Sequence, residues 1–349
     1  GVLQQGREFF HKSLEEKLLC GVDNGSSGSG GYRGYFGIGM EDLENKDGTR
    51  DLSKEEEKGG SDDDSGGRCD KLTVKKGDYK EGFDCGLENI DGYHENQTAK
   101  NEYLNFFGEN IWPEEASDGT INNTGFRKAL VEYQRALLEL ADKLLVAFAV
   151  SLNENSSGAT SSDDSIMIPD DYFIARSRNP MCTLRLLHYP PNNHVPSADS
   201  IKSPSGCGAH TDYGLFTILQ QDSIGGLQVR NRSNAWIDAH PLPGSFVINV
   251  GDMLSWWTGG EYASTVHRVI SPSMKIVSHK DGNDAVEDIV EERNGNHRYS
   301  VPFFFNPDYD AVVKRIRGED VEHYEGEDYQ TAIEVLRERY SGTFQAAKK

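Results

Sequence analysis

The residue types best suited to bind a metal are concentrated in one tripeptide, His210-Thr211-Asp212. Side chains two residues apart on a β-strand point to the same face, so an imidazole and a carboxylate can converge there on one point. The chain has ten histidines, so a chance His-x-Asp is not rare, and the pair alone is an incomplete site. The pattern therefore predicts a metal site whose third ligand comes from elsewhere in the chain.

The third ligand that the sequence favours is His267, which stands among β-forming residues after Gly259-Gly260. Two histidines and one carboxylate form the facial arrangement of non-haem Fe(II), which leaves three coordination positions open. Zinc accepts the same ligands, but a structural zinc site is normally closed by a fourth one. The competing interpretation of His267 is a half-buried core histidine. Glu261 is an alternative carboxylate, which we expect to point to solvent from a turn.

The other histidines lack a carboxylate at strand spacing or lie in polar surroundings. We interpret the first kind as ordinary residues: His188, His194, His240, His279 and His297. We expect the second kind to be solvated: His11, His94 and His323.

A second pair at the same spacing, Arg298 and Ser300, can present a guanidinium and a hydroxyl that together hold a carboxylate. The apolar run 301–305 that follows predicts burial, and a buried arginine needs an anionic partner. The residue types leave open whether that partner is a protein carboxylate or a ligand. Tyr189, which precedes Pro190-Pro191, either adds a phenol donor or is simply a packed aromatic residue.

Strand patterns dominate the second half of the chain, with Gly and Pro between them. We expect strands over 181–189, 225–230, 235–238, 246–257, 265–270 and 298–305, and a strand pair over 210–220. Many short strands at close spacing favour an antiparallel barrel or jelly roll.

Helical periodicity marks four segments, 4–19, 100–112, 125–152 and 328–340. In the first, Phe10, Leu14 and Leu18 are spaced to form one apolar face. The third has the strongest stripe, which includes Leu130, Leu137 and Ala141 and should pack on the sheet.

Three polar segments interrupt these patterns. Residues 41–78 are dense in Asp, Glu, Lys, Gly and Ser, which predicts a disordered acidic insertion. A calcium site at Asp62 to Asp64 is an alternative, but the spacing is not that of an EF-hand loop. The other two polar segments are 153–164 and 278–297.

The overall composition limits the partners. The 349-residue chain has a net charge of −21, which argues against a nucleic-acid backbone or an anionic membrane surface. Its five cysteines form no CxxC motif and fit a reducing compartment. No apolar run is long enough to span a bilayer, so cytoplasmic is the default expectation, although the chain begins with Gly1 rather than Met. Nothing indicates an oligomeric state.

Taken together, these motifs resemble a known family, the Fe(II)- and 2-oxoglutarate-dependent dioxygenases of the isopenicillin N synthase-like (iron/ascorbate-dependent oxidoreductase) branch. The matching blocks, in order, are Leu184-Arg-Leu-Leu-His-Tyr-Pro190, Ala209-His-Thr-Asp-Tyr-Gly214, Gly225-Gly-Leu-Gln-Val229, Asn249-Val-Gly-Asp-Met-Leu254, Thr258-Gly-Gly-Glu-Tyr-Ala-Ser-Thr-Val-His-Arg-Val269 and Arg298-Tyr-Ser-Val-Pro-Phe-Phe304. The segments Gly34-Tyr-Phe36 and Lys80-Glu-Gly-Phe83 are similar to the family's N-terminal part. The resemblance covers most of the chain outside the polar insertions.

The resemblance implies an α+β fold, a double-stranded β-helix (jelly roll) with flanking helices and an N-terminal helical region. It implies that His210, Asp212 and His267 bind Fe(II), and that Arg298, Ser300 and Tyr189 bind 2-oxoglutarate. The implied activity is hydroxylation or desaturation of a small organic molecule with O₂, coupled to conversion of 2-oxoglutarate to succinate, with ascorbate as a reductant. The implied regions are 1–165, 166–310 for the jelly roll and 311–349.

Two alternatives remain. In isopenicillin N synthase the Arg-x-Ser pair holds the substrate and 2-oxoglutarate is not used, so an oxidase of that kind is one rival. A non-catalytic binding protein on the same fold is the other, although no metal ligand is replaced. The sequence also departs from many plant members at Leu187, where they carry Asn.

Overall fold

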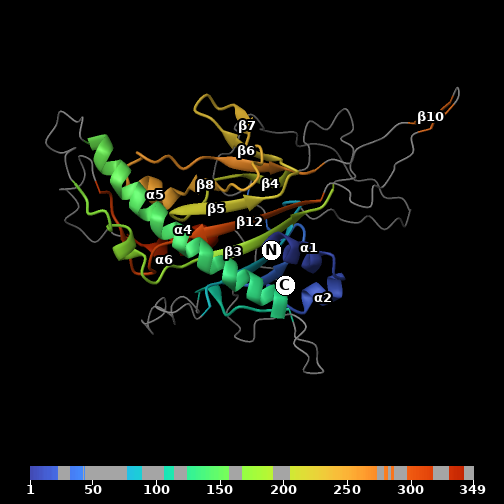
Figure 1. Ribbon diagram of the computed structural model, residues 1–349, viewed down its shortest axis with the longest axis horizontal. Helices are drawn as coiled ribbons and strands as arrows, with labels where there is room; N and C mark the ends of the chain where they lie inside the picture. Colours follow the sequence, from blue (N-terminus) through green and yellow to red (C-terminus); the bar gives the residue numbers. More distant parts are fainter. Residues whose placement is uncertain are drawn as a thin grey trace, which may run out of the picture.

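The computed structural model describes residues 1–22, 32–41, 43, 77–88, 106–113, 124–156, 167–191, 205–272, 279–281, 284–286, 297–316 and 330–341. Two antiparallel sheets form the body of the molecule, and the long helix α4 crosses the larger one (Figure 1). The arrangement is α+β with a jelly-roll core, as the strand pattern and the resemblance predicted. In the described residues no helix is long and apolar enough to cross a membrane.

The larger sheet has six strands in the order β1-β2-β3-β12-β5-β8. Their bounds are Gly34–Phe36, Glu81–Gly86, Thr183–Tyr189, Arg298–Phe305, Phe216–Gln221 and Val247–Val250. Strand β12 lies between β3 and β5, so Ser300 pairs with Leu187 on one side and Gln221 on the other. The predicted Arg298–Ser300 pair therefore sits inside the sheet, at the start of β12.

The smaller sheet has four strands in the order β4-β9-β6-β7. Their bounds are Ser205–His210, His267–Ile270, Leu227–Arg230 and Trp236–Asp238. The last residue of β4, His210, is the register partner of the first residue of β9, His267. Pairing of these two strands therefore brings together two histidines that are distant in the chain.

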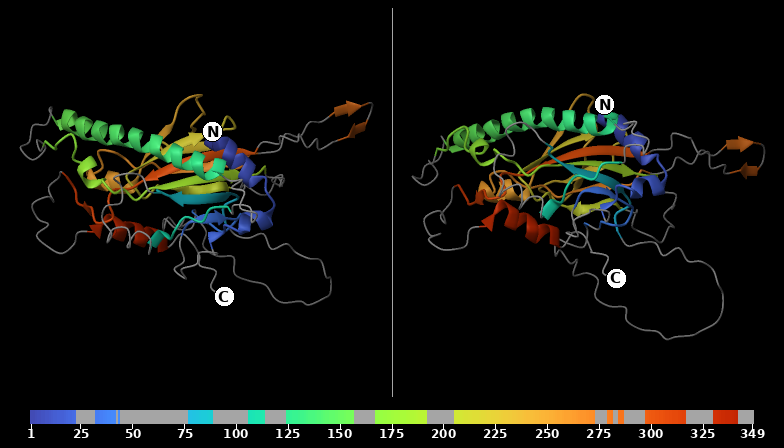
Figure 2. Two further views of the ribbon diagram at one scale, coloured as in Figure 1. Left: turned by 60° about the horizontal axis from the view of Figure 1, so that its bottom comes forward. Right: turned by 90° about the horizontal axis from the view of Figure 1, so that it is seen from below.

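Helix α4 runs from Thr124 to Ser156 and covers one face of the larger sheet (Figure 2). The predicted helix 125–152 is confirmed, and its stripe is buried at Leu130, Leu137 and Ala141. The helix continues into the predicted polar break because Asn153 is buried and its amide exchanges two hydrogen bonds with the backbone of Ile168.

The predicted continuous helix 4–19 is wrong. The structure has two helices, α1 (Val2–Phe10) and α2 (Leu14–Leu18). Ser13 starts the second helix with a capping box, in which its hydroxyl accepts from the Glu16 amide and the Glu16 carboxylate accepts from the Ser13 amide. Because of the break, Phe10, Leu14 and Leu18 do not form the predicted apolar face. Phe10 is buried, whereas Leu14 and Leu18 are 58% and 48% exposed.

Two strand predictions also need correction. The segment 246–257 divides into β8 and a helix, α5 (Asp252–Trp257), because the chain turns at Gly251, whose amide donates to the carbonyl of Leu215. Within α5 the Trp257 side chain is fully buried, but Trp256 is 40% exposed. The segment 210–220, predicted as a strand pair, contains residues of two strands that do not pair with each other: β4 ends at His210 in the smaller sheet, and β5 begins at Phe216 in the larger one.

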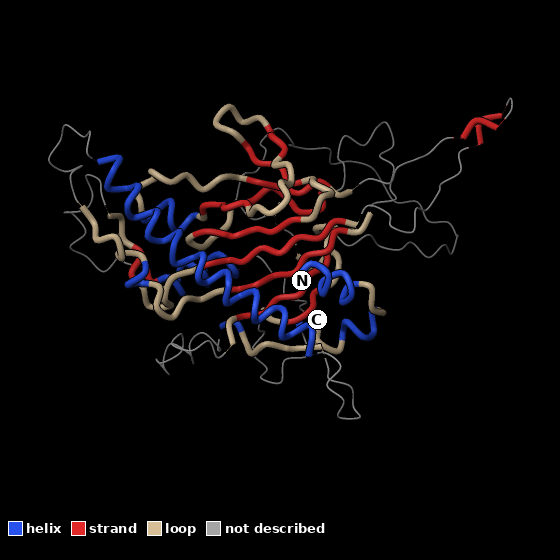
Figure 3. Tube along the Cα trace, in the orientation of Figure 1, coloured by secondary structure: helices blue, strands red, loops and turns tan. Residues whose placement is uncertain are grey.

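The remaining elements are short. They are the 3₁₀ turn η3 (Ile174–Arg176), β10 (His279–Asp281), β11 (Asp284–Val286), β13 (Val312–Val313), β14 (Gln330–Thr331) and the final helix α6 (Ala332–Ser341). Strands β10 and β11 pair with each other in a hairpin inside segment 278–297 and stand apart from both sheets (Figure 3). Helix α6 confirms the predicted C-terminal helix. Of the predicted helix 100–112, residues 100–105 lie outside the described residues, Phe106 and Phe107 are helical, and 108–112 are not, because the chain takes a positive φ of 78° at Gly108.

The ends of the acidic segment 41–78 do not fit the prediction of a solvated insertion. Glu41 and Asp78 are buried, with 3% and 4% of their surface exposed, because each forms an ion pair with Lys80. Most of the segment between them, including Asp62 to Asp64 and Cys69, lies outside the described residues. The four cysteines in the described part are buried and form no disulfide. Strands β1 and β2 join the jelly-roll sheet, and the division into three regions stays a prediction.

Candidate metal centre

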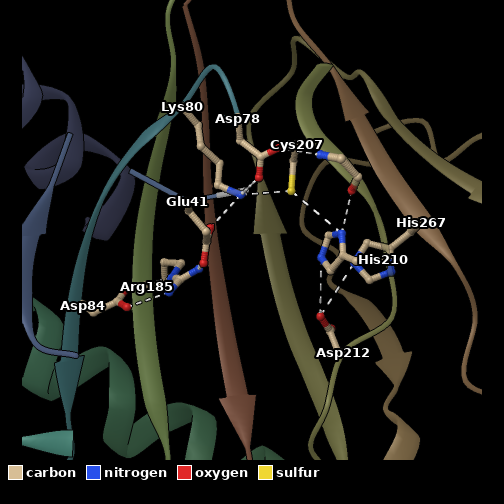
Figure 4. A network of polar contacts seen from close by, with 10 residues as sticks. Glu41, Asp78, Lys80, Asp84, Arg185, Cys207, His210, Asp212 and His267 are labelled. Atoms are coloured by element: carbon tan, nitrogen blue, oxygen red, sulfur yellow. Dashed lines mark hydrogen bonds and ion pairs between the residues drawn. The ribbon is translucent and has the colours of Figure 1, made fainter. Parts of the chain in front are cut away.

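Three side chains form a compact cluster where the two sheets face each other (Figure 4). His210 ends β4, His267 begins β9, and Asp212 lies in the loop that follows β4. The Asp212 Oδ1 atom is 3.9 Å from His210 Nε2 and 3.7 Å from His267 Nε2. One ligand atom of each residue lies within 4.8 Å of the other two, which is close enough for all three to bind one ion.

The contacts that position Asp212 in this cluster differ from those that its spacing predicted. Strand alternation cannot place it, because β4 ends at His210. Its position is fixed by the Asp252 amide, which donates to the Asp212 carbonyl at 2.8 Å. Its Oδ2 atom accepts hydrogen bonds from Thr217 Oγ1 at 2.5 Å and Asn249 Nδ2 at 2.7 Å. These contacts leave Oδ1 directed at the two imidazoles.

Each histidine is oriented through its other ring nitrogen. His210 Nδ1 lies 2.7 Å from the carbonyl of Gly208, and His267 Nδ1 lies 3.1 Å from that of Thr265. A carbonyl only accepts, so both contacts place the proton on Nδ1. The Nε2 lone pairs are then free to bind a metal, as in metal sites whose outer contacts fix the tautomer.

Burial and local charge favour the forms that bind a metal. Burial by itself would raise the pKa of Asp212, but the two imidazoles, Thr217 and Asn249 outweigh it and hold the pKa below its ordinary value. Burial and the neighbouring His210 lower the pKa of His267. An anionic carboxylate beside neutral imidazoles is the donor set of a 2-His-1-carboxylate iron site, so these residues fit Fe(II).

Arg298 is almost fully buried, and its described contacts are all with neutral acceptors. Its Nε donates to the Gly225 carbonyl at 2.6 Å, Nη1 to Ser300 Oγ at 3.1 Å and Nη2 to Gln221 Oε1 at 3.4 Å. No carboxylate of the described residues pairs with it, which favours a ligand over a protein group as its anionic partner.

Two neighbouring features shape this arginine site. The turn at Gly225-Gly226 has positive φ angles of 81° and 90°, and a side chain at Gly226 would meet the Ile270 carbonyl at 2.8 Å. The Arg298 guanidinium lies 4.7 Å from the centre of the Tyr189 ring. Burial raises the pKa of Tyr189 to about 12, so its hydroxyl stays a donor.

One cavity joins this arginine to the metal cluster, and we call it the arginine cavity. It contains about 660 Å³ of open space, including its mouth. Arg298, Ser300 and Tyr189 line one part, and His210, Asp212 and His267 line another. Its other walls are largely apolar, with Leu219, Leu227, Val247 and Val269 among them. All six residues singled out in the sequence therefore face the same space.

Sequence reasoning missed hydrogen-bond partners that come from other strands. Thr217 and Asn249 carry no spacing signal that relates them to Asp212. His188, interpreted as ordinary, pairs with Glu81 on the adjacent strand at 2.7 Å and contacts His297 Nδ1 at 2.7 Å. A carboxylate from another strand cannot be found by spacing along one strand. Glu261 is exposed, as expected.

Comparison with known proteins yields one family. Residues 180–307 match the family described as the 2OG-Fe(II) oxygenase superfamily. Homoarginine-6-hydroxylase 2-ODD-233 of Oryza sativa is 30% identical over 89% of this chain and 70% of its own length. The Glycine max protein homoarginine-6-hydroxylase 2-ODD-C23 is 29% identical over 88% and 69%.

A solved structure agrees with this match. A 2OG-Fe(II) oxygenase family protein from Caulobacter crescentus superposes on this chain with a TM-score of 0.60 and 25% sequence identity. The superposition covers 97% of this chain and 84% of the Caulobacter protein.

Proposed function

The chain belongs to the 2OG-Fe(II) oxygenase superfamily, and we propose that its His210, Asp212 and His267 hold the Fe(II) while Arg298, Ser300 and Tyr189 hold 2-oxoglutarate. The chain is an oxidoreductase that uses iron, 2-oxoglutarate and O₂ to hydroxylate or desaturate a small organic molecule. The observation that carries the residue assignment is the single cavity that contains both the three-ligand cluster and a buried arginine without a described carboxylate partner.

Bound Fe(II) would supply redox chemistry. In a hydroxylation, 2-oxoglutarate, O₂ and a C–H bond give succinate, CO₂ and an alcohol, and one of the two atoms of O₂ enters the succinate while the other enters the alcohol. Thr217 and Asn249 hold one oxygen of Asp212 so that the other faces the ion. The carbonyls of Gly208 and Thr265 keep both imidazoles in the ligating tautomer.

The arginine end of the cavity provides the co-substrate site. Arg298 and the Ser300 hydroxyl are 3.1 Å apart and can both donate to one carboxylate, which is the strong, charge-assisted kind of hydrogen bond. Tyr189 covers the guanidinium and excludes water from it. The opposite end of a five-carbon diacid would then point toward the metal cluster. The apolar walls between the two ends fit its methylene groups.

The prime substrate is a small organic molecule. The two plant relatives are named for homoarginine, which makes L-homoarginine one of the first compounds to assay. The described cysteines, which form no disulfide, favour the cytosol as the place of action.

The test of the assignment is an anaerobic titration. Purified protein receives Fe(II) and then 2-oxoglutarate, and the weak visible charge-transfer band of the chelate is recorded. We expect the band in the parent protein and a weakening of 2-oxoglutarate binding by about 10- to 100-fold in Arg298→Ala, the loss expected when a charged hydrogen-bond donor is removed. Ser300→Ala removes only the hydroxyl and should have a smaller effect.

Two results would contradict the assignment. A band of equal affinity in Arg298→Ala would remove the arginine from the co-substrate site. Iron binding without any band would favour the oxidase that does not use 2-oxoglutarate. Arg230→Ala is the matched control, because Arg230 is exposed on β6 and should leave the band unchanged.

A further inference from the structure

A second cavity meets the arginine cavity at the metal cluster, and we call it the ion-pair cavity. It contains about 510 Å³ of open space and is lined by Glu41, Tyr213, Asn306 and Tyr340, among others. Leu43, Arg185, His210, Asp212 and Phe304 line both cavities. Two members of the metal cluster, His210 and Asp212, therefore line both cavities, and the proposed 2-oxoglutarate site accounts for only one of these cavities.

The charged side chains of the ion-pair cavity, apart from the metal ligand Asp212, are Glu41 and Arg185. Arg185 Nη1 lies 3.0 Å from Glu41 Oε1 and 3.3 Å from Oε2. Both side chains are buried, with 9% and 2% of the Arg185 and Glu41 side chains exposed. A cation and an anion thus stand next to each other on the cavity wall.

Three further charged side chains, Asp84, Lys80 and Asp78, surround this pair (Figure 4). Asp84 on β2 accepts from both Nε and Nη2 of Arg185, each at 2.7 Å. Lys80 Nζ lies 2.8 Å from Glu41 and 2.8 Å from Asp78. Burial would raise the pKa of Glu41, but Arg185 and Lys80 outweigh it and hold the pKa well below its ordinary value, so Glu41 remains anionic.

The pair keeps hydrogen-bonding capacity for a ligand. The four bonds from Arg185 to Asp84 and Glu41 use at most four of its five N–H groups. The two bonds from Arg185 and the contact with Lys80 use three of the roughly four acceptor positions of the Glu41 carboxylate. Each partner therefore retains the capacity for one more hydrogen bond.

Stability alone is a weak reason for such a pair, because burying charges costs desolvation and apolar residues of the same volume often do as well. A wall with one positive and one negative group complements a ligand with both signs. A purely anionic ligand would be repelled by Glu41, and a purely cationic one by Arg185. The aromatic side chains of Phe304, Tyr213 and Tyr340 line the same space and fit a carbon chain or ring.

Given the proposed function, we propose that the ion-pair cavity binds the prime substrate, and that Glu41 and Arg185 select a free α-amino acid by its ammonium and carboxylate groups. The Arg185 guanidinium binds the carboxylate and Glu41 binds the ammonium group. The side chain of the amino acid then extends along the aromatic wall toward the metal cluster. Helix α6 supplies Leu336 and Tyr340 to this wall and is fastened by Arg339, whose Nη2 lies 2.5 Å from Asp252.

The experiment uses the anaerobically loaded Fe(II)–2-oxoglutarate protein, to which air and one amino acid are added. The panel is the twenty protein amino acids and L-homoarginine, and the readout is succinate formation above the level without an added compound. We expect at least one member to stimulate turnover. Its Nα-acetyl and carboxamide derivatives should each raise KM by about 10- to 100-fold, because each leaves one charge of the wall unpaired.

Glu41→Gln tests the wall itself. We expect the KM of the stimulating amino acid to rise about 10- to 100-fold, with the 2-oxoglutarate charge-transfer band unchanged and little effect on the acetylated derivative. Arg185→Lys should also raise the KM of the amino acid, because a lysine ammonium cannot bind the carboxylate of the amino acid with the planar fork of an arginine. Glu81→Gln is the matched control, because Glu81 is also a buried, ion-paired carboxylate, with Lys17, but does not line the cavity.

The outcomes separate this inference from the proposed function. Absence of the charge-transfer band in the parent would overturn the co-substrate site. With the band present, three results would overturn the amino-acid site: no member of the panel stimulates turnover, the two derivatives serve as well as the parent compound, or Glu41→Gln leaves KM unchanged.

Discussion

Neighbouring side chains fix the orientation of the Asp212 carboxylate. Its two oxygens have different surroundings: Oδ2 accepts from Thr217 and Asn249, whereas Oδ1 faces the two imidazoles. A carboxylate held in this way can bind a metal through one oxygen without rotating. We therefore expect the hydroxyl of Thr217 to contribute to metal affinity through its hydrogen bond to Asp212.

We predict that Thr217→Val weakens metal binding by about 10- to 100-fold, the usual cost of losing a hydrogen bond to a metal ligand. The measurement is titration of the apo-protein with Fe(II) under anaerobic conditions, or with Mn(II) as a substitute that resists oxidation. Thr183→Val is the control, because Thr183 is also buried and hydrogen-bonded, but to Arg33. Equal losses in the two variants would show that the effect is a general one of buried threonines.

Among the elements, three neighbouring strands share a cluster of polar rings. His188 of β3 contacts Glu81 of β2 and His297, and it stacks on Tyr299 of β12 with ring centroids 4.8 Å apart. Burial, together with His188 and His11, lowers the pKa of His297 to about 4. The cluster thus links β2, β3 and β12 through polar side chains, and one neighbour in it, His297, has a lowered pKa.

This cluster predicts a loss of stability in mild acid. In the unfolded chain His297 has an ordinary pKa of about 6.5, so below that pH the unfolded state binds a proton that the folded state does not take up until about pH 4. The contribution of His297 is therefore complete above about pH 6.5 and is lost as the pH falls toward 4. His297→Gln should reduce the slope of unfolding free energy against pH in this window.

The measurement is denaturant unfolding of the parent and His297→Gln at several pH values between about 7.5 and about 4.5, a range that spans most of the shift, at constant ionic strength. His240→Gln, at an exposed histidine, is the control and should keep the slope of the parent. An unchanged slope in His297→Gln would assign the acid response to other groups.

In the molecule as a whole, the metal cluster joins the two sheets. His210 and His267 come from β4 and β9 of the smaller sheet, whereas Asp212 is held by Thr217 of β5 and Asn249 of β8 in the larger one. An ion bound by all three residues would therefore connect both layers of the jelly roll. Its binding free energy adds to the stability of the folded state, since the unfolded chain has no such site.

We predict that metal ions raise the unfolding temperature and that EDTA reverses the effect. At a free metal concentration of about 100 times Kd, linkage gives about 2.7 kcal/mol of added stability. Thermal unfolding of the parent with and without Mn(II) measures this shift. His267→Ala should lose it, whereas His240→Ala, away from the cluster, should retain it. A full shift in His267→Ala would place the stabilising ion elsewhere.

Local periodicity and residue type were enough to predict several features of this protein. The long helix α4 was predicted because its apolar stripe repeats over many turns, and the jelly roll because short strand patterns recur between turns. His210, Asp212, His267, Arg298 and Ser300 were selected by side-chain chemistry and spacing, and the structure brings all five to one cavity. Two predictions of secondary structure were nevertheless wrong in part, since a capping box at Ser13 divides a predicted helix and α5 replaces part of a predicted strand.

Contacts across the sheets, in contrast, follow from tertiary packing. Glu41 and Arg185 are 144 positions apart in the chain, and Glu41 was placed in a solvated insertion because its neighbours in sequence are polar. Asp212 faces the histidines because of hydrogen bonds from Thr217 and Asn249, not because of strand alternation. Partners of this kind depend on the packing of distant strands, and no periodicity along one segment can encode them. The candidate metal ligands could thus be selected from the sequence by side-chain type and spacing, whereas the charges that surround the ion-pair cavity became visible only in the fold.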